Sequence, residues 1–120
     1  MTNAAAVERF RDLALALPDA VEGSHAGAPD FRANGRIFAT LAYGDRGLGT
    51  LKLTPSQQAD CLSDANDLFE AVHGGWGRMG MTFIRLDAPE DVLIGAIALA
   101  YRNVISKPAP RRKKATSTQA

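Results

Sequence analysis

The chain has 120 residues, of which 46% are hydrophobic and 22% charged, and its formal net charge is +1. This length suits one domain with a single hydrophobic core, and the composition is that of a soluble globular protein. No apolar run reaches the roughly 20 residues of a membrane span, the first residues lack the order of a signal peptide, and one cysteine excludes an intrachain disulfide, so we expect a cytoplasmic protein of bacterial type with no membrane partner.

The small net charge hides a division along the chain. Five basic residues lie within eight positions from Lys107 on, which leaves nine Lys and Arg against thirteen Asp and Glu in residues 1–106, a net charge of −4. We expect residues 1–106 to form one mildly acidic domain and residues 107–120 to form a basic, disordered tail. The other basic residues of the tail are Arg111, Arg112, Lys113 and Lys114.

The first half of the chain predicts a helix followed by strands. Apolar residues at three- and four-residue spacing predict a helix over residues 3–17, which ends at Pro18. Asn34-Gly35 then separates two strand-like runs, residues 29–33 and 36–43, and this dipeptide is the strongest short hairpin signal because both residues tolerate positive φ. A turn at residues 44–47 leads to a third strand, residues 48–53, and the strands form an antiparallel meander.

The second half begins with a capping box. Thr54 is the N-cap, Pro55 suits the first helical position and Gln57 completes the box, which predicts a short helix that ends near Asp64. Residues 68–72 and 82–86 follow as extended segments, and a last helix begins at residues 87–90 with Asp87 as its cap. This order predicts an α+β domain in which the N- and C-terminal helices pack on one face of an antiparallel meander sheet, with a short middle helix.

A glycine-rich segment is the most distinctive part of the sequence. Residues 74–82, GGWGRMGMT, hold the only tryptophan and four of the eleven glycines. With PxFR at residues 29–32, GRIFA at 35–39 and LKLxPxQQ at 51–58, in this order, the segment resembles the MmcQ/YjbR family over roughly residues 7–105. The resemblance implies a frataxin-like (CyaY-like) α+β fold, and a DNA-binding protein that uses a double wing of β-hairpins.

DNA binding without sequence preference requires Lys and Arg side chains that neutralise phosphates and release counterions. Two arginines flank the Asn-Gly turn and a third lies in the next turn, so we expect these turns to form wings that straddle a groove. Trp76 is expected to stack on an unpaired base or to contact a sugar. The candidate contacts are Arg32, Arg36, Arg46, Lys52, Trp76, Arg78 and Arg85 in the domain, and Lys107, Arg111, Arg112, Lys113 and Lys114 in the tail.

Each candidate also has a plain structural interpretation. Surface arginines are common, and a tryptophan more often anchors the edge of a core than contacts a ligand. The acidic domain should repel DNA at long range. A protein- or small-ligand-binding module that uses the Trp76 loop and the sheet face is therefore the alternative, and it would gain support if Asp30, Asp45 and Asp87 neutralised the arginines.

The sequence offers no catalytic constellation. His25 and His73 lack the spacing of metal ligands, and Cys61 is expected to be a partly buried structural thiol. An iron site, suggested by the frataxin-like fold, needs an acidic ridge of oxygen ligands, but Glu8 and Asp12 of the first helix alternate with arginines. We therefore expect a non-enzymatic monomer without a cofactor or a metal.

Overall fold

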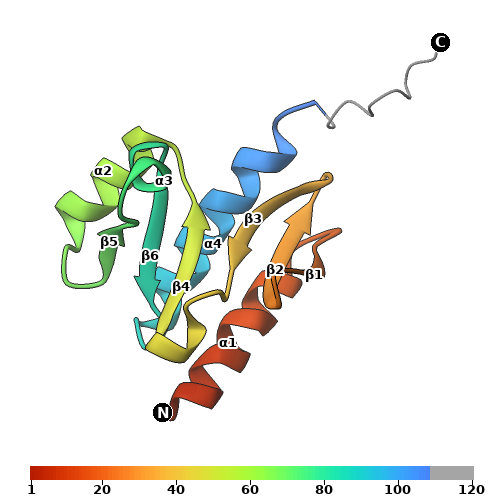
Figure 1. The fold of residues 1–120 in the computed structure, drawn as a ribbon, viewed down its shortest axis with the longest axis horizontal. Helices are drawn as coiled ribbons and strands as arrows, with labels where there is room; N and C mark the ends of the chain where they lie inside the picture. The colour runs from red at the N-terminus through yellow and green to blue at the C-terminus, as the bar shows by residue number, and fades with distance from the viewer. Residues whose placement is uncertain (109–120) are drawn as a thin grey trace.

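The computed structural model of the chain describes residues 1–108, so Arg111, Arg112, Lys113 and Lys114 lie outside the described residues. The strands of this range form one antiparallel sheet in the order β1-β2-β3-β4-β6-β5 (Figure 1). The predicted α+β class is confirmed. The helices are α1 (Asn3–Leu15), α2 (Pro55–Asp64), α3 (Gly75–Arg78) and α4 (Glu90–Ile105), with a 3-10 turn η1 (Gly44–Arg46), and the strands are β1 (Val21–His25), β2 (Ala28–Ala33), β3 (Arg36–Thr40), β4 (Leu48–Lys52), β5 (Phe69–Ala71) and β6 (Met81–Arg85).

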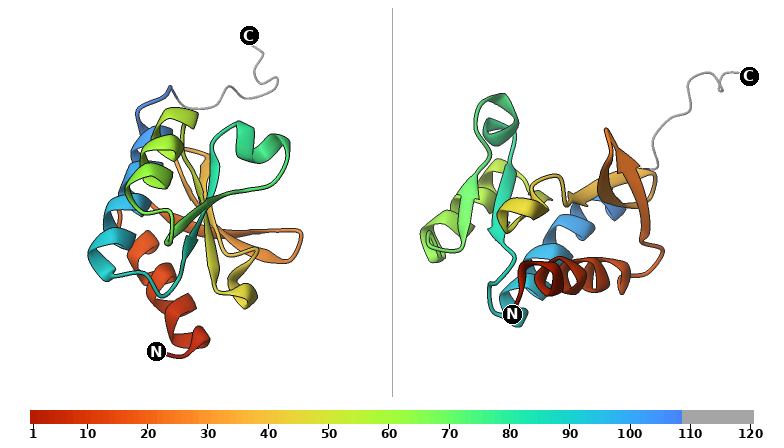
Figure 2. Two further views of the ribbon diagram at one scale, coloured as in Figure 1. Left: turned by 90° about the vertical axis from the view of Figure 1, so that its left-hand side faces the viewer. Right: turned by 60° about the horizontal axis from the view of Figure 1, so that its bottom comes forward.

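The terminal helices α1 and α4 pack on the same face of the sheet (Figure 2). Phe10 of α1 packs against Phe31 of β2, and Tyr101 of α4 packs against Phe38 of β3, with ring centroids 6.1 and 5.6 Å apart. Burial of these apolar side chains is the main force that joins the helix layer to the sheet. The helix α3 lies apart from this layer, at the tip of the hairpin formed by β5 and β6 (Figure 2).

The register of β4 on β6 decides which side chains of β4 reach solvent. Gly49 faces the helices, because a Cβ at this position would lie 2.6 Å from the ring of Phe10. Leu51, two residues later, is also buried in the core, whereas Lys52 pairs with Met81 and is exposed. Alternation along the strand therefore places Lys52 on the face opposite Leu51, toward solvent.

Three local features differ from the predictions. The strand β1 and the helix α3 were not predicted, and α4 begins after Pro89, which caps it without a side-chain hydrogen bond. The prediction of Asp87 as the cap is wrong because its carboxylate binds Arg85. None of the helices within residues 1–108 is both long enough and apolar enough to cross a membrane.

Candidate nucleic-acid interface

Two of the candidate arginines are bound to carboxylates. Arg32 donates from Nε and Nη2 to the two carboxylate oxygens of Asp30, at 2.8 and 3.1 Å. Arg85 holds Asp87 in the same bidentate way, at 2.9 and 2.8 Å. A guanidinium fork that already holds a carboxylate has fewer donors left for a phosphate and little net charge around it. These two arginines are therefore poor candidates for DNA contacts.

The pair formed by Arg85 and Asp87 gives a prediction about pH. The hydrogen bond from Arg85 lowers the pKa of Asp87 below its ordinary value. Since the folded-state pKa is depressed, this pair stabilises the fold above the ordinary aspartate pKa of about 4, and its contribution is lost as the pH falls through the folded-state value. Arg85→Gln should raise the pKa of Asp87 toward that of an unpaired aspartate. NMR titration of the carboxyl carbon measures this pKa, and identical titrations in both proteins would contradict the ion pair.

Arg46 and Arg36 lie at opposite ends of the sheet. Arg46 belongs to η1, between β3 and β4, and its guanidinium lies over the ring of Tyr43, 5.8 Å from the ring centre. Arg36 follows the turn between β2 and β3, at the other end of β3 (Figure 1). Successive turns of an antiparallel meander alternate between its two ends, because each strand reverses the direction of the chain. The prediction that these two turns straddle one groove is therefore wrong.

Hydrogen bonds bring two other candidate cations, Arg36 and Lys52, close to the end of α4. Asn34, in the turn between β2 and β3, donates a hydrogen bond of 3.0 Å to a carbonyl in the last turn of α4. The neighbouring Arg36 donates to the carbonyl of Pro108 at 2.8 Å. On the other side of the helix, Asn103 donates to the carbonyl of Lys52 at 3.2 Å. Long-range hydrogen bonds therefore hold two separate strand ends around the C-terminus of α4.

The helix α3 is joined to the same end of the domain. The side-chain amide of Gln58, in α2, donates to the carbonyls of Gly77 and Met81, each at 3.0 Å. The backbone N–H of Leu53, which follows β4, donates to the carbonyl of Gly80 at 3.3 Å. Figure 1 shows the result: α3, the end of β4, the turn between β2 and β3 and the end of α4 all lie at the top of the domain.

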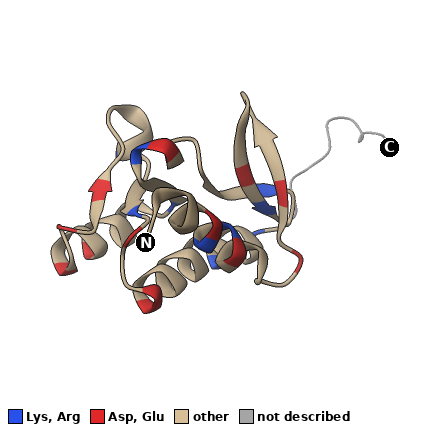
Figure 3. Cartoon of the chain, turned by 90° about the horizontal axis from the view of Figure 1, so that it is seen from below, with Lys and Arg blue, Asp and Glu red and all other residues tan. Residues whose placement is uncertain are grey.

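Four segments that lie at this end contain no acidic residue. Residues 33–37, 52–59, 72–82 and 98–108 hold neither Asp nor Glu. Their Lys and Arg side chains make no ion pair with any carboxylate of residues 1–108. We call this region of the domain the basic end. Its cations are Arg36, Lys52, Arg78, Arg102 and Lys107. Figure 3 views the domain from below, where Asp and Glu positions are spread over the opposite side.

Comparison with known proteins places the chain in a family. The model of the YjbR family matches residues 15–103. The chain belongs to the YjbR family. The crystal structure of Deinococcus radiodurans protein DR2400, described as a DUF419 domain, matches with a TM-score of 0.68 over 84% of this chain and 79% of that chain. At 19% sequence identity this likeness shows the fold alone. No curated protein matches the chain.

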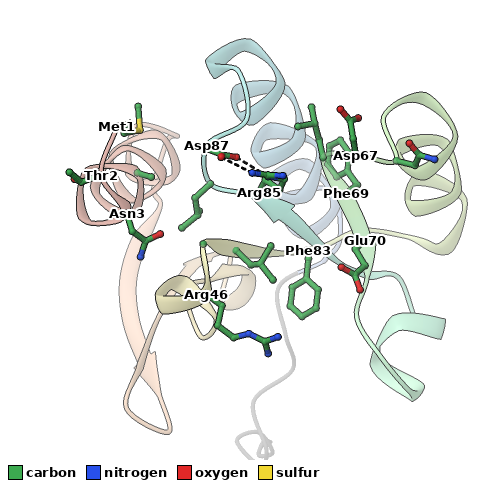
Figure 4. Close-up of a pocket in the computed structure, with 16 residues that line it drawn as sticks. Met1, Thr2, Asn3, Arg46, Asp67, Phe69, Glu70, Phe83, Arg85 and Asp87 are labelled. Atoms are coloured by element: carbon green, nitrogen blue, oxygen red, sulfur yellow. Dashed lines mark hydrogen bonds and ion pairs between the residues drawn. The ribbon is translucent and has the colours of Figure 1, made fainter.

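This YjbR-family domain also has a cleft, of about 660 Å³, at the end opposite the basic end. It lies between the start of α1 and the strands β5 and β6, and the ion pair of Arg85 with Asp87 lies within it (Figure 4). Its charged lining residues are Arg46, Asp67, Glu70, Arg85 and Asp87. Acidic groups outnumber basic ones here, which does not suit a polyanion. Trp76 does not line this cleft, so the cleft is not the ligand site that the alternative interpretation assigned to the Trp76 loop.

Two exposed side chains of α3 bear on the candidate interface. Trp76 is 68% exposed, so its interpretation as an anchor of the core edge is wrong. Met79, which the sequence interpretation missed, is 71% exposed in the same turn. The sequence analysis also omitted Arg102 from the candidate contacts. Its position outside the apolar stripe of the last helix indicates an exposed side chain. The sequence interpretation treated residues 74–82 as a loop, and only a helical turn places Trp76 and Met79 on one side.

The groups considered for chemistry are dispersed. Among residues 1–108, no three His, Cys, Asp or Glu side chains lie close enough together to hold a metal ion. Cys61 is partly buried in α2, and burial raises the pKa of its thiol, with the carboxylates of Asp64 and Asp60 acting in the same direction. A raised pKa keeps the thiol protonated and unreactive, as expected of a structural cysteine.

Proposed function

We propose that this YjbR-family protein is a non-enzymatic DNA-binding protein that contacts phosphates through the basic end. The single observation that supports this proposal is that four acid-free segments, which hold five Lys and Arg residues, lie at one end of the domain. Residues 33–37 and 52–59 lie beside the C-terminus of α4, and residues 72–82 lie beside the end of β4. Neutralisation of phosphates by such side chains releases condensed counterions and supplies affinity without sequence preference. The basic residues of the tail follow this end in the sequence and would add further phosphate contacts.

The acidic character of the rest of the domain gives this binding an orientation. Residues 1–106 have a net charge of −4, and acidic positions are spread over the side opposite the basic end. Long-range repulsion should therefore turn the acidic side away from DNA, while the basic end approaches it. The proposal thus needs no overall positive charge on the domain, only the separation of charge between its two ends.

Charge reversal at Lys52 tests the proposal. Lys52→Glu should weaken binding roughly tenfold at about 0.1 M salt and should lower the slope of log affinity against log salt by about one, the loss of one phosphate contact. Arg46→Glu is the matched control: it changes the net charge equally, at an exposed residue of the opposite end. Fluorescence anisotropy of labelled duplex and single-stranded DNA measures both values. Equal losses in the two variants would refute a role for the basic end.

A truncated chain separates the domain from the tail. The chain should end after Pro108, because the carbonyls of Lys107 and Pro108 accept hydrogen bonds from Asn34 and Arg36. Residues 1–108 should keep salt-dependent DNA binding with a smaller slope. Complete loss of affinity would mean that the tail alone binds DNA, and absence of binding in the full chain would refute the proposal.

A further inference from the structure

The tip of the hairpin between β5 and β6 exposes two large apolar side chains to solvent. Trp76 and Met79 are 68% and 71% exposed, and they lie three residues apart in one helical turn, which places them side by side. Gly77, between them, is buried and faces the opposite way. An exposed tryptophan and methionine on a protruding tip are costly in water unless another surface covers them.

The tip is held in a fixed conformation by close contacts. A Cβ at Gly77 would lie 1.6 Å from the carbonyl oxygen of Val72, and a Cβ at Gly80 would lie 2.0 Å from that of Leu53. Only glycine permits backbones to approach so closely. The amide of Gln58 adds hydrogen bonds to three acceptors within the same hairpin. The backbone that carries Trp76 is therefore held in place, and the exposed ring projects from a closely packed turn.

The charges around this tip indicate which kind of ligand matches it. Arg78 lies in the same turn, and Lys52 pairs in register with Met81, two residues beyond Met79. No acidic residue occurs in residues 72–82. An occupant that matches this surface has a flat aromatic face and negative charge beside it. Two apolar side chains are too few for a typical protein interface, which takes about 20 to 30 residues from each partner.

We propose that Trp76 is a stacking platform for an unpaired base, with Arg78 and Lys52 on the flanking phosphates, so that the protein prefers single-stranded to duplex DNA. This inference rests on the proposed function and assigns its substrate class. In a duplex both faces of a base are already stacked, whereas a single strand offers faces that an indole ring can cover. The restrained backbone beneath the ring lowers the entropy lost when a base stacks on it.

Intrinsic fluorescence tests the proposal directly, because Trp76 is the only tryptophan of the chain. Titration with an oligothymidylate of about 15 nucleotides should quench the emission, and a duplex of equal charge should quench it less. Trp76→Ala should weaken binding of the single strand by roughly 5- to 150-fold, with little effect on the duplex, and Trp76→Phe should lose less. Met79→Ala is the matched control: it removes equally exposed apolar surface without a ring, and it should lose least.

The outcomes separate this proposal from the one on which it rests. Equal affinity for both forms of DNA, with unchanged emission and no effect of Trp76→Ala, would overturn the stacking role and leave DNA binding by the basic end in place. No binding of either form would overturn both. A blue shift of the emission with vesicles of phosphatidylglycerol, without quenching by the oligothymidylate, would assign the tip to a lipid surface and would also overturn the proposal.

Discussion

Replacing Gly77 with alanine should lower the free energy of unfolding by about 3 kcal/mol, the upper part of the range for overpacked sites. The new Cβ would lie 1.6 Å from the carbonyl oxygen of Val72 and 2.7 Å from its carbonyl carbon. These are backbone atoms, and the N–H of Val72 is itself bonded to the carbonyl of Met81 at 3.0 Å. No rotamer change can relieve the clash, so the hairpin must shift and lose contacts. Urea denaturation measures the effect as a lower transition midpoint.

Gly75 is the matched control, two residues earlier in the same helix. A Cβ there would meet only the end of the Arg78 side chain, at an ordinary distance of 3.6 Å. Gly75→Ala should therefore be neutral or stabilise the protein by up to about 1 kcal/mol, since alanine restricts the unfolded chain. Similar small effects of the two substitutions would show that Gly77 does not lie against the carbonyl of Val72 as described. The emission of Trp76 in each variant reports separately whether the tip itself has moved.

Features set by neighbouring residues were predictable from the sequence. The capping box of α2 forms as predicted: Thr54 accepts from the N–H of Gln57 at 3.1 Å, and Gln57 accepts from the N–H of Thr54 at 2.9 Å. Asn34 and Gly35 adopt the positive φ angles, 55° and 73°, that the hairpin signal requires. In both cases the interacting groups lie within four residues, so the local sequence determines the structure.

The elements missed in the sequence depend on distant partners. The strand β1 has little apolar alternation because it lies at the edge of the sheet, and its turn uses Ala26, an uncommon residue at positive φ. Two of the four residues of α3 are glycine, which disfavours a helix. Hydrogen bonds from Gln58, 19 residues away from Gly77, hold this turn in place. Tertiary contacts thus override weak local propensity.

In the candidate site too, contacts between neighbouring residues were predictable and contacts between distant residues were not. Asp30 and Arg32 lie two residues apart in a strand, so their placement on one face could have been predicted from the alternation of side chains. The gathering of cations at the basic end could not, because it depends on hydrogen bonds between residues far apart in the sequence. Lys52 meets Asn103 across 51 residues, and Arg36 meets Pro108 across 72. No local pattern in a single sequence contains this information.

Asn34→Ala should remove one of the contacts that assemble the basic end, and we expect it to lower the free energy of unfolding by about 3 kcal/mol. The side chain donates to the carbonyls of Val104 and Lys107, at 3.0 and 2.9 Å, and each hydrogen bond contributes about 1 kcal/mol. The residue also has a φ of 55°, where an alanine costs about 1 to 2 kcal/mol more than a glycine. Urea denaturation measures the total.

Asn34→Gly separates the two contributions, because glycine accepts the positive φ and lacks only the side-chain donors. It should cost about 2 kcal/mol, less than Asn34→Ala, and both variants should bind DNA more weakly than the natural chain because the end of α4 is no longer docked on the turn between β2 and β3. A loss below about 0.5 kcal/mol in both variants would contradict docking of the turn on α4. If both variants lose the expected free energy of unfolding but keep their DNA affinity, the phosphate contacts do not require the arrangement of the basic end. The tail would then be the main site of DNA binding.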